Sequence, residues 1–319
     1  MKTILKRIAT LAVVAGIGAA SVSAGHAADK VIRIGFQKYG TLILLKAKGL
    51  LEEKLKPLGW SVEWDEFPAG PQMLEALNVG SIDFGTVGEA PPIFAQAAGA
   101  PLVYVGYEPP APKGEAIVVP KDSPLKSVAD LKGKIVALNK GSNVHYLLVK
   151  ALEKAGLKYT DIQTAFLTPA DARAAFEKGA VDAWVIWDPF LASAEQTLDA
   201  RQLTDGTGLV DNHQFYLASR QFTDAHPDIV ETAFKAIGEV DAWVQANEKD
   251  VATQYADLIG VPAPVLAAAV VRQGYGVIPI NSPGDEVVAE QQKLADTFFA
   301  LGLIPKAIRI ADAVRKPQS

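Results

Sequence analysis

Cysteine is absent from this chain of 319 residues, and only four histidines are present. Without cysteine the chain can form no disulfide, offers no thiolate to a substrate or metal, and lacks the residue that carries a bacterial lipid anchor. Motifs for nucleotide binding and serine hydrolysis are missing too: there is no Gly-x-Gly-x-x-Gly, no Walker A sequence and no Gly-x-Ser-x-Gly elbow. Because the histidines are scattered, we expect no metal site. Because these motifs are missing, we expect no cofactor and no catalytic residue.

Long hydrophobic runs are lacking except near the N-terminus. There, the cations Lys2, Lys6 and Arg7 precede an apolar run at 8–20 and a small-x-small sequence at 25–27. This pattern is typical of a secretory signal peptide spanning 1–27, cleaved near Ala27. An uncleaved anchor is the alternative, but the run is shorter than the roughly 20 apolar residues that span a bilayer. We therefore expect a periplasmic protein with no direct membrane insertion after cleavage.

Positive charge is also scarce, since the formal net charge is −5 and signal cleavage would remove three further cations without removing an acid. An acidic chain argues against nucleic acid and against an anionic membrane as partners, because both are bound by clustered Lys and Arg. Any anionic ligand must then be held by local dipoles rather than by the overall charge.

The chain alternates short β-rich runs with helical ones and ends in helices alone, which predicts an α/β fold of two doubly wound lobes. Strands are expected at 31–36, 62–67, 82–85, 103–107, 116–120, 135–139, 164–167, 183–187 and 215–220. Helices are expected at 41–48, 72–78, 92–98, 128–131, 144–155, 169–179, 189–197, 229–247, 252–258, 263–272 and 285–300. Alternation of this kind predicts parallel sheets, with ligands beyond the carboxyl ends of the strands.

A proline-rich linker at 109–112 separates the first series of strands and helices from the second. We predict that the chain crosses between lobes there and again near 214–217, which makes a two-segment hinge. The first lobe then comprises 28–112 and 218–319, with the C-terminal helices packed on it, and the second comprises 113–217. A mature chain of about 290 residues suits two lobes.

Two turns rich in glycine and proline are the most informative feature of the sequence. Gly70 and Pro71 follow the strand at 62–67, and Gly88 and Glu89 follow the strand at 82–85. Each turn is predicted to open a helix, and a helix start carries unpaired N–H groups and partial positive charge. Two such starts facing one crevice would bind an anion without Lys or Arg.

Further candidate ligand residues follow the first strand and the strand at 135–139. Gln37 could donate its amide to a ligand, although a solvated loop glutamine is the alternative. Ser142 suits a helix N-cap whose hydroxyl proton stays available, with Asn143 beside it. His145 lies one turn later, and a groove-lining or packing role is favoured over a Ser-His pair, for which there is no orienting acid.

Aromatic residues supply candidates for the apolar part of a ligand. Trp187 ends the strand at 183–187 where a crevice wall is expected, and Tyr107 and Phe215 are expected near the crevice and hinge. Asp188 precedes Pro189, so capping the next helix explains it. A secreted hydrolase using Glu89 and Asp188 remains an alternative from a different functional class.

Four stretches resemble the solute-binding proteins of ABC importers for aliphatic sulfonates. They are EFPAGPQMLEALNVGSID at 66–83, PPIFAQAAGA at 91–100, LTPADARAAF at 167–176 and VDAWVIWDP at 181–189. The resemblance implies a two-lobed, hinged receptor of the type II periplasmic binding protein class. Such a receptor closes around a small organic sulfonate, delivers it to a transmembrane permease for sulfur uptake and catalyses nothing. The resemblance carries over as ligand-facing Gln37, Gly70, Gly88, Ser142, Asn143 and Trp187.

The sequence departs from the family pattern at Glu89 and around Asn143, which leaves the preferred sulfonate open. Receptors for taurine, nitrate or a thiamine precursor share the expected architecture and are the alternatives within the same class.

Overall fold

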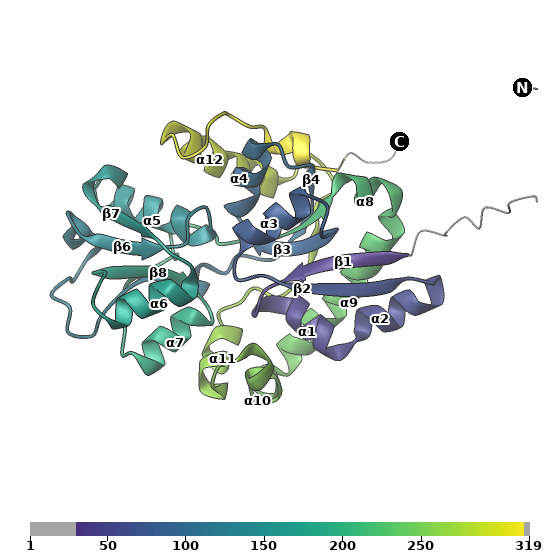
Figure 1. The fold of residues 1–319 in the computed structure, drawn as a ribbon, viewed down its shortest axis with the longest axis horizontal. Coiled ribbons are helices and arrows are strands. Elements are labelled where there is room, and N and C mark those ends of the chain that lie inside the picture. The colour runs from purple at the N-terminus through teal and green to yellow at the C-terminus, as the bar shows by residue number, and fades with distance from the viewer. Residues whose placement is uncertain (1–29, 316–319) are drawn as a thin grey trace, which may run out of the picture. The chain divides into compact units, whose positions relative to one another are not determined.

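The computed structural model describes residues 30–315, so the predicted signal peptide lies outside the described residues. The described chain folds around two β-sheets with helices on their faces (Figure 1). The six-stranded sheet has the order β11 (Ile278–Pro279), β4 (Leu102–Tyr107), β10 (Gln214–Ser219), β3 (Phe84–Gly88), β1 (Val31–Phe36) and β2 (Ser61–Glu66). The five-stranded sheet has the order β7 (Gln163–Phe166), β6 (Ile135–Leu138), β8 (Ala183–Trp187), β5 (Glu115–Val119) and β9 (Arg201–Asp205).

Both sheets are mixed, which corrects the prediction of parallel sheets. β1 pairs with β2 and β3 in parallel, but β10 runs antiparallel between β3 and β4. In the second sheet β6 is parallel to β7 and β8, whereas β5 is antiparallel to β8 and β9. The antiparallel strands β5 and β10 are the first that the chain forms after each passage between the sheets. The α/β class itself is confirmed.

The helices follow the amphipathic patterns in the sequence. In chain order they are α1 (Gly40–Lys48), α2 (Leu50–Leu55), α3 (Gly70–Asn78), α4 (Pro91–Ala98), α5 (Asn143–Lys154), α6 (Pro169–Glu177), α7 (Phe190–Thr197), α8 (Arg220–Ala225), α9 (Pro227–Ala246), α10 (Glu248–Ile259), α11 (Ala263–Val270) and α12 (Glu286–Ala300). Short 3-10 helices occupy Lys56–Leu58, Pro112–Gly114, Val128–Leu131, Tyr159–Asp161 and Ile310–Ala313.

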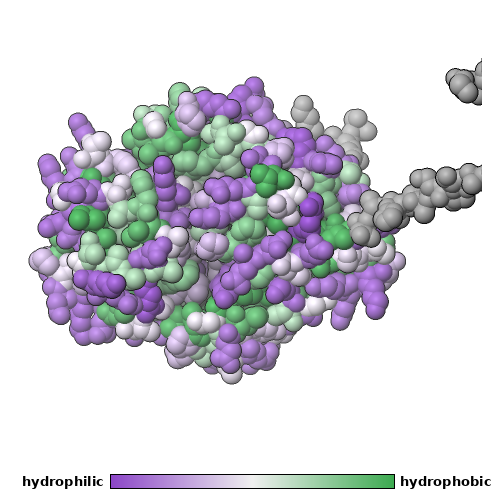
Figure 2. Space-filling model, viewed as in Figure 1, coloured by the Kyte–Doolittle hydropathy of each residue, from purple (hydrophilic) through white to green (hydrophobic). Residues whose placement is uncertain are grey.

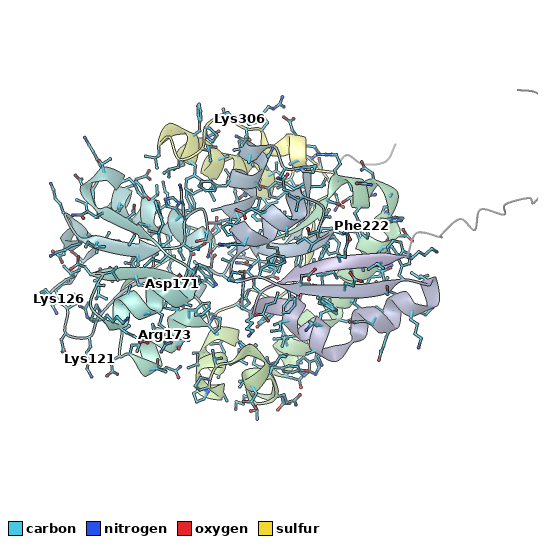
Figure 3. The ribbon with its side chains drawn as sticks, in the orientation of Figure 1. Lys121, Lys126, Asp171, Arg173, Phe222 and Lys306 are labelled. Atoms are coloured by element: carbon cyan, nitrogen blue, oxygen red, sulfur yellow. The ribbon has the colours of Figure 1, made fainter. Side chains whose placement is uncertain are left out.

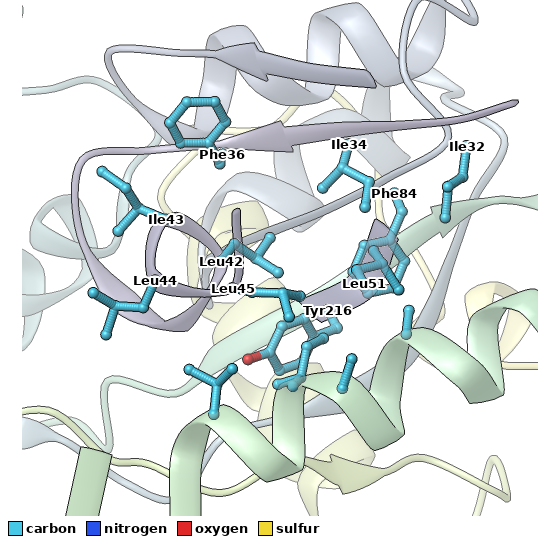
Figure 4. Packing of buried hydrophobic residues seen from close by; sticks show 14 of the residues in the cluster. Ile32, Ile34, Phe36, Leu42, Ile43, Leu44, Leu45, Leu51, Phe84 and Tyr216 are labelled. Atoms are coloured by element: carbon cyan, nitrogen blue, oxygen red, sulfur yellow. The ribbon is translucent and has the colours of Figure 1, made fainter. Parts of the chain in front are cut away.

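In the core of the first sheet, the apolar faces of the helices pack against the strands. α1 and α9 cover one face of the sheet, and their apolar side chains meet Ile34 of β1, Phe84 of β3 and Tyr216 of β10 (Figure 4). In α9, Ile229, Ala233 and similarly spaced residues are buried, as expected for one face of a helix. A separate cluster around Trp184 fills the second sheet. Each sheet therefore has its own core.

Most predicted elements are present with ends shifted by a few residues, but several predictions were wrong. The sequence analysis missed α2, α8 and β9, and it placed no strand after 220, where the structure has β11. β3 extends to Gly88, so Gly88 belongs to a strand and pairs with Gln214 rather than lying in a turn. α7 begins at Phe190 with Pro189 as its N-cap, one residue later than expected.

Two chain segments connect the sheets, one between β4 and β5 and one between β9 and β10. They lie side by side: the Ala111 N–H donates to the Asp211 carbonyl (3.0 Å), and the Gly206 N–H donates to the Pro112 carbonyl (2.9 Å). The second crossing ends before Gln214, not at 214–217, because β10 is already a strand of the first sheet. The predicted division into lobes stays a proposal, but a boundary at 217 would divide β10.

Hydrophilic residues are spread among smaller hydrophobic patches on the face drawn in Figure 2. Large exposed apolar side chains such as Val79 and Val271 are distributed over different helices or their ends. Among residues 30–315, none of the helices has the length and apolar character needed to cross a membrane.

Candidate functional site

A cavity of about 150 Å³ lies at the carboxyl ends of strands from both sheets. Residues after β1 and β2 form one wall, and residues after β7 and β8 form the other. We call it the Trp187 cavity; it is lined by Gln37, Lys38, Tyr39, Glu66, Phe67, Pro68, Thr168, Pro169, Ala170, Trp187, Pro189 and Phe190. Its volume equals that of about five water molecules in the liquid, enough for a small organic molecule.

Helix starts surround this cavity. Tyr39 is the N-cap of α1, Thr168 is the N-cap of α6 and Pro189 is the N-cap of α7. Pro68 directly precedes Ala69, the N-cap of α3. The first N–H groups of an α-helix have no partner within the helix, and the helix dipole places partial positive charge there. The cavity is thus suited to an anion, and more helices contribute than the sequence analysis expected.

The charged side chains in the wall largely offset each other. Lys38 is exposed, and its Nζ lies 3.4 Å from Oε1 of Glu66. Apolar surface comes from Trp187, whose indole is 6 % exposed and contacts Phe190 edge-to-face with ring centroids 6.2 Å apart. The cavity therefore combines dipolar donors with an aromatic wall, which suits an anionic group that carries an organic tail.

Arg173 holds two of the helix starts in position. It lies on α6 beside Asp171, at the labelled position in Figure 3. Its Nη1 donates to Oγ of Ser193 on α7 over 2.7 Å, and its Nε pairs with Glu177 on α6 over 2.7 Å. Because this contact joins α6 to α7, their N-termini remain together at the cavity.

Of the predicted ligand residues, Gln37 and Trp187 line this cavity. Gln37 is buried, and its Nε2 lies 3.4 Å from the Thr86 carbonyl, a long hydrogen bond that a ligand could replace. Gly70 and Pro71 form the first turn of α3, next to Pro68 in the wall. A Cβ on Gly70 would come within 2.9 Å of Pro91, so this helix start needs glycine to pack against α4.

Ser142 and Asn143 lie at the start of α5 with their polar groups already in use. The Ser142 hydroxyl donates to the Asn139 carbonyl (2.8 Å) and makes no capping bond, so the expectation of a capping oxygen and an available proton was wrong. Asn143 Nδ2 donates to Oε2 of Glu115 (2.6 Å) and to Oδ1 of Asn212 (3.0 Å). Asn143 thus ties α5 to the first residue of β5 and to the second crossing segment.

His145 packs among aromatic rings and does not line the Trp187 cavity. Its Nε2 is 2.7 Å from the Tyr159 hydroxyl, and its ring stacks on Phe94 with centroids 6.2 Å apart. Burial, and to a smaller extent the charge of Lys140, lowers the pKa of His145 to about 4. This is the packing role that the sequence analysis favoured.

Glu89 and Phe215 line a second cavity of about 180 Å³, which we call the Glu89 cavity. Burial raises the pKa of Glu89 to about 8, even though its Oε2 accepts a hydrogen bond from the His213 backbone N–H. Tyr107 contacts the rings of His213 and Phe215 at the edge of this region. Gly88 packs against Asn143, where a Cβ would approach to 2.9 Å. None of these residues lines the Trp187 cavity.

Asp188 is held by the protein itself. Its Oδ1 accepts from the Ala192 N–H of α7 (3.0 Å) and lies 3.5 Å from Nη1 of Arg272. Burial raises its pKa to about 6. Asp188 thus accepts from the first turn of α7, but it lies one residue before the N-cap Pro189 and is not the N-cap that was expected. Asp188 and Glu89 line different cavities, which argues against a pair of catalytic carboxylates.

The sequence analysis missed several residues of the Trp187 cavity, including Lys38, Tyr39 and the Thr168-Pro169 pair. Thr168 directly precedes Pro169 after β7, and its Oγ1 accepts from the Asp171 N–H (3.3 Å) as a helix cap. A capping motif directly after a strand was the available signal, because a capped helix start is also an anion-binding element.

Comparison with known families decides which class of protein has this architecture. The family model for the substrate binding domain of ABC-type glycine betaine transport systems matches residues 30–257. The chain belongs to this family of substrate-binding domains. That assignment agrees with two sheets joined by two crossings and a cavity between their strand ends.

Individual relatives cover nearly the whole of this substrate-binding protein. An aliphatic sulfonates-binding protein of Escherichia coli (strain K12) is 47% identical over 92% of this chain and 91% of its own length. One of Bacillus subtilis (strain 168) is 33% identical over 98% of this chain and 94% of its own length. The structure of the alkanesulfonate-binding protein of Xanthomonas axonopodis pv. citri bound to MOPS, 42% identical, matches with a TM-score of 0.86 over 91% of this chain and 100% of that one.

Proposed function

We propose that this protein is the periplasmic solute receptor of an ABC importer, and that it binds aliphatic sulfonates in the Trp187 cavity and delivers them to a membrane permease without chemical change. The convergence of the starts of α1, α3, α6 and α7 on that cavity carries the proposal. A sulfonate is a monoanion with three acceptor oxygens and no proton to donate, so N–H groups at helix starts satisfy it.

The aromatic wall supports an organic sulfonate over an inorganic anion. Trp187 and Phe190 offer apolar surface that sulfate or nitrate would leave uncovered, whereas an alkyl or ring substituent would bury it. Two relatives are named for aliphatic sulfonates, and a third was solved with a sulfonate buffer bound, which agrees with this preference.

A melting-temperature screen tests the proposal. The purified protein is heated with methanesulfonate, longer alkanesulfonates, MOPS, taurine, sulfate and nitrate. A ligand at a hundred times its dissociation constant stabilises the folded protein by about 2.7 kcal/mol, which shifts the melting temperature measurably. We expect alkanesulfonates to give the largest shifts. If sulfate or nitrate gives shifts equal to those of the sulfonates, the tail is not recognised and the proposal fails.

Taurine is the alternative that the cavity itself addresses. Its ammonium group requires a carboxylate partner, and Glu66, the carboxylate in the wall, lies beside Lys38. We therefore expect taurine to bind more weakly than ethanesulfonate, which has the same chain length without the amino group. Stronger binding of taurine would assign the receptor to taurine instead.

Catalysis is tested separately. Ester, glycoside and sulfonate substrates are incubated with the protein and with Glu89→Gln. We expect no turnover in either sample. Steady turnover that disappears in Glu89→Gln would establish the hydrolase alternative.

A further inference from the structure

The Glu89 cavity gathers metal-ligand side chains from parts of the chain that are far apart in sequence. Asp211 and His213 belong to the second crossing segment, Glu290 lies on α12, and Glu89 follows β3. The ligand atoms of Asp211, His213 and Glu290 all lie within 4.8 Å of one another. The sequence analysis expected no metal site because the histidines are scattered, and it had no means of seeing this grouping.

The hydrogen bond of His213 fixes which of its nitrogens can bind a metal. Nδ1 lies 2.7 Å from the Glu108 carbonyl oxygen, and because a carbonyl only accepts, Nδ1 carries the proton. In the neutral ring Nε2 then has a lone pair, and it lies 3.7 Å from Oε2 of Glu290. Histidines that bind metals are usually oriented by such a bond from the other ring nitrogen.

Glu89 supplies a second and independent observation. Its side chain lines the same cavity and is only 4 % exposed. Oε2 accepts from the His213 backbone N–H over 3.2 Å, while Oε1 has no hydrogen-bond partner among the described residues. A buried carboxylate oxygen without a partner is costly, and a bound cation would satisfy it.

The carboxylates of the Glu89 cavity are not paired with the lysine that lines it. Lys293 lines the cavity, but its side chain is exposed, and within residues 30–315 it forms no ion pair with Glu89, Asp211 or Glu290. The cavity therefore brings three carboxylates and one imidazole together without a paired cation.

We propose that Asp211, His213 and Glu290, with Glu89 as a fourth ligand, bind a divalent transition-metal ion of the zinc type. Mg²⁺ and Ca²⁺ prefer oxygen ligands alone, whereas an imidazole with carboxylates suits zinc. Tetrahedral zinc with bonds of about 2.1 Å needs donor atoms about 3.4 Å apart, so the ligands must move closer than they are here. Glu290, whose side chain is 37% exposed, has room to make that movement.

Calorimetric titration of EDTA-treated protein with ZnCl₂ tests the site. We expect one ion per chain, and at least about tenfold weaker binding in His213→Ala and in Glu290→Gln. Glu286→Gln is the matched control. Glu286 is exposed, lies one turn earlier on α12 and does not belong to the cluster, and its substitution removes the same charge as Glu290→Gln. It should retain the affinity of the unmodified protein. MgCl₂ in excess should not displace zinc.

Three results would overturn the proposal: no zinc binding, equal affinities in Glu290→Gln and Glu286→Gln, or equal competition by MgCl₂. Because Glu290 is partly exposed, its substitution keeps the test valid even if His213→Ala fails to fold. The site does not depend on the proposed function. Melting shifts with methanesulfonate in the same samples report on the Trp187 cavity, so failure of one proposal leaves the other measurable.

Discussion

The two cavities are similar in size but opposite in chemistry. The Trp187 cavity, of about 150 Å³, is lined by helix starts and aromatic rings, and its one carboxylate lies beside a lysine. The Glu89 cavity, of about 180 Å³, contains several carboxylates and an imidazole. Both lie next to the segments that join the sheets. The comparison teaches that an acidic protein can offer an anion site if the acids nearest to it have partners within the protein: Glu66 lies beside Lys38, and Asp188 bonds α7 and lies beside Arg272.

The largest expected effect concerns the buried acids. Glu115 is fully buried beside Asn143, and burial, with a further contribution from Glu89, raises its pKa well above the usual range. An acid whose pKa is raised by folding stabilises the protein fully below its unfolded pKa of about 4.5, and this stability is lost as the pH rises toward the folded pKa. Between pH 5 and pH 8, chemical denaturation should show the unmodified protein losing more unfolding free energy than Glu115→Gln.

An exposed acid provides the control for that experiment. Glu63 on β2 is exposed, so Glu63→Gln should show the same pH dependence as the unmodified protein. If the unfolding free energy changes with pH equally in Glu115→Gln and Glu63→Gln, Glu115 is not the cause of the pH dependence.

The next largest effect concerns sulfonate affinity, which should change in variants of the Trp187 cavity and not in variants of the Glu89 cavity. Trp187→Ala should weaken binding of a long alkanesulfonate by about 10- to 100-fold and of methanesulfonate much less, because only the long tail loses apolar contact. Trp187→Phe should recover part of the affinity. Calorimetry with both ligands measures the difference. Glu290→Gln should bind both sulfonates as the unmodified protein does, and equal losses for the two ligands in Trp187→Ala would indicate a packing role instead.

A smaller effect is expected at the contact between Gly88 and Asn143. In Gly88→Ala the new methyl group would lie 2.9 Å from Asn143 Cβ, so β3 or α5 must shift at a cost of about 1–2 kcal/mol. Thermal unfolding measures this cost as a lower melting temperature. In Gly238→Ala on α9 the nearest atom is 3.6 Å away, and an alanine favours the helix, so that variant should be unchanged or slightly more stable. A loss in both variants would refute the steric explanation.

The smallest effect is expected for Lys38, which lines the Trp187 cavity beside Glu66. An exposed ion pair contributes only about 0.2–1 kcal/mol, so Lys38→Ala should reduce sulfonate affinity by about two- to threefold. The loss should diminish as salt is added, because the charge acts partly through solvent. A hundredfold loss would mean that a cation, and not the helix starts, binds the anion.

The sequence predicted the framework better than it predicted the side-chain contacts. Alternating apolar runs located β1, β6 and β8, and the residues that follow them led to Gln37 and Trp187 in one cavity. β9 was missed because its residues are all half-buried, which gives no clear alternation of apolar and polar positions. A strand or helix shows a periodic pattern of apolar residues when one of its faces is buried and the other is exposed.

Contacts between distant segments explain the remaining differences. Ser142 has the residue type of a capping serine, yet its hydroxyl donates to the Asn139 carbonyl. Asn143 donates to Glu115 of β5 and to Asn212 of the second crossing segment. His213 was set aside as an isolated histidine, but folding brings it to Glu290 on α12. The local sequence does not predict these contacts, because each depends on the position of a segment that is distant in the chain.

The position of β10 has a consequence for biosynthesis. Phe215 of β10 pairs with Tyr107 of β4 on one side and with Val87 of β3 on the other. The first sheet therefore has a gap at its centre until the ribosome has made more than a hundred further residues, including the whole second sheet. Non-local pairing of this kind slows folding. Until β10 has been synthesised, β3 and β4 each lack their shared neighbour, so the first sheet is completed only after the second has been made.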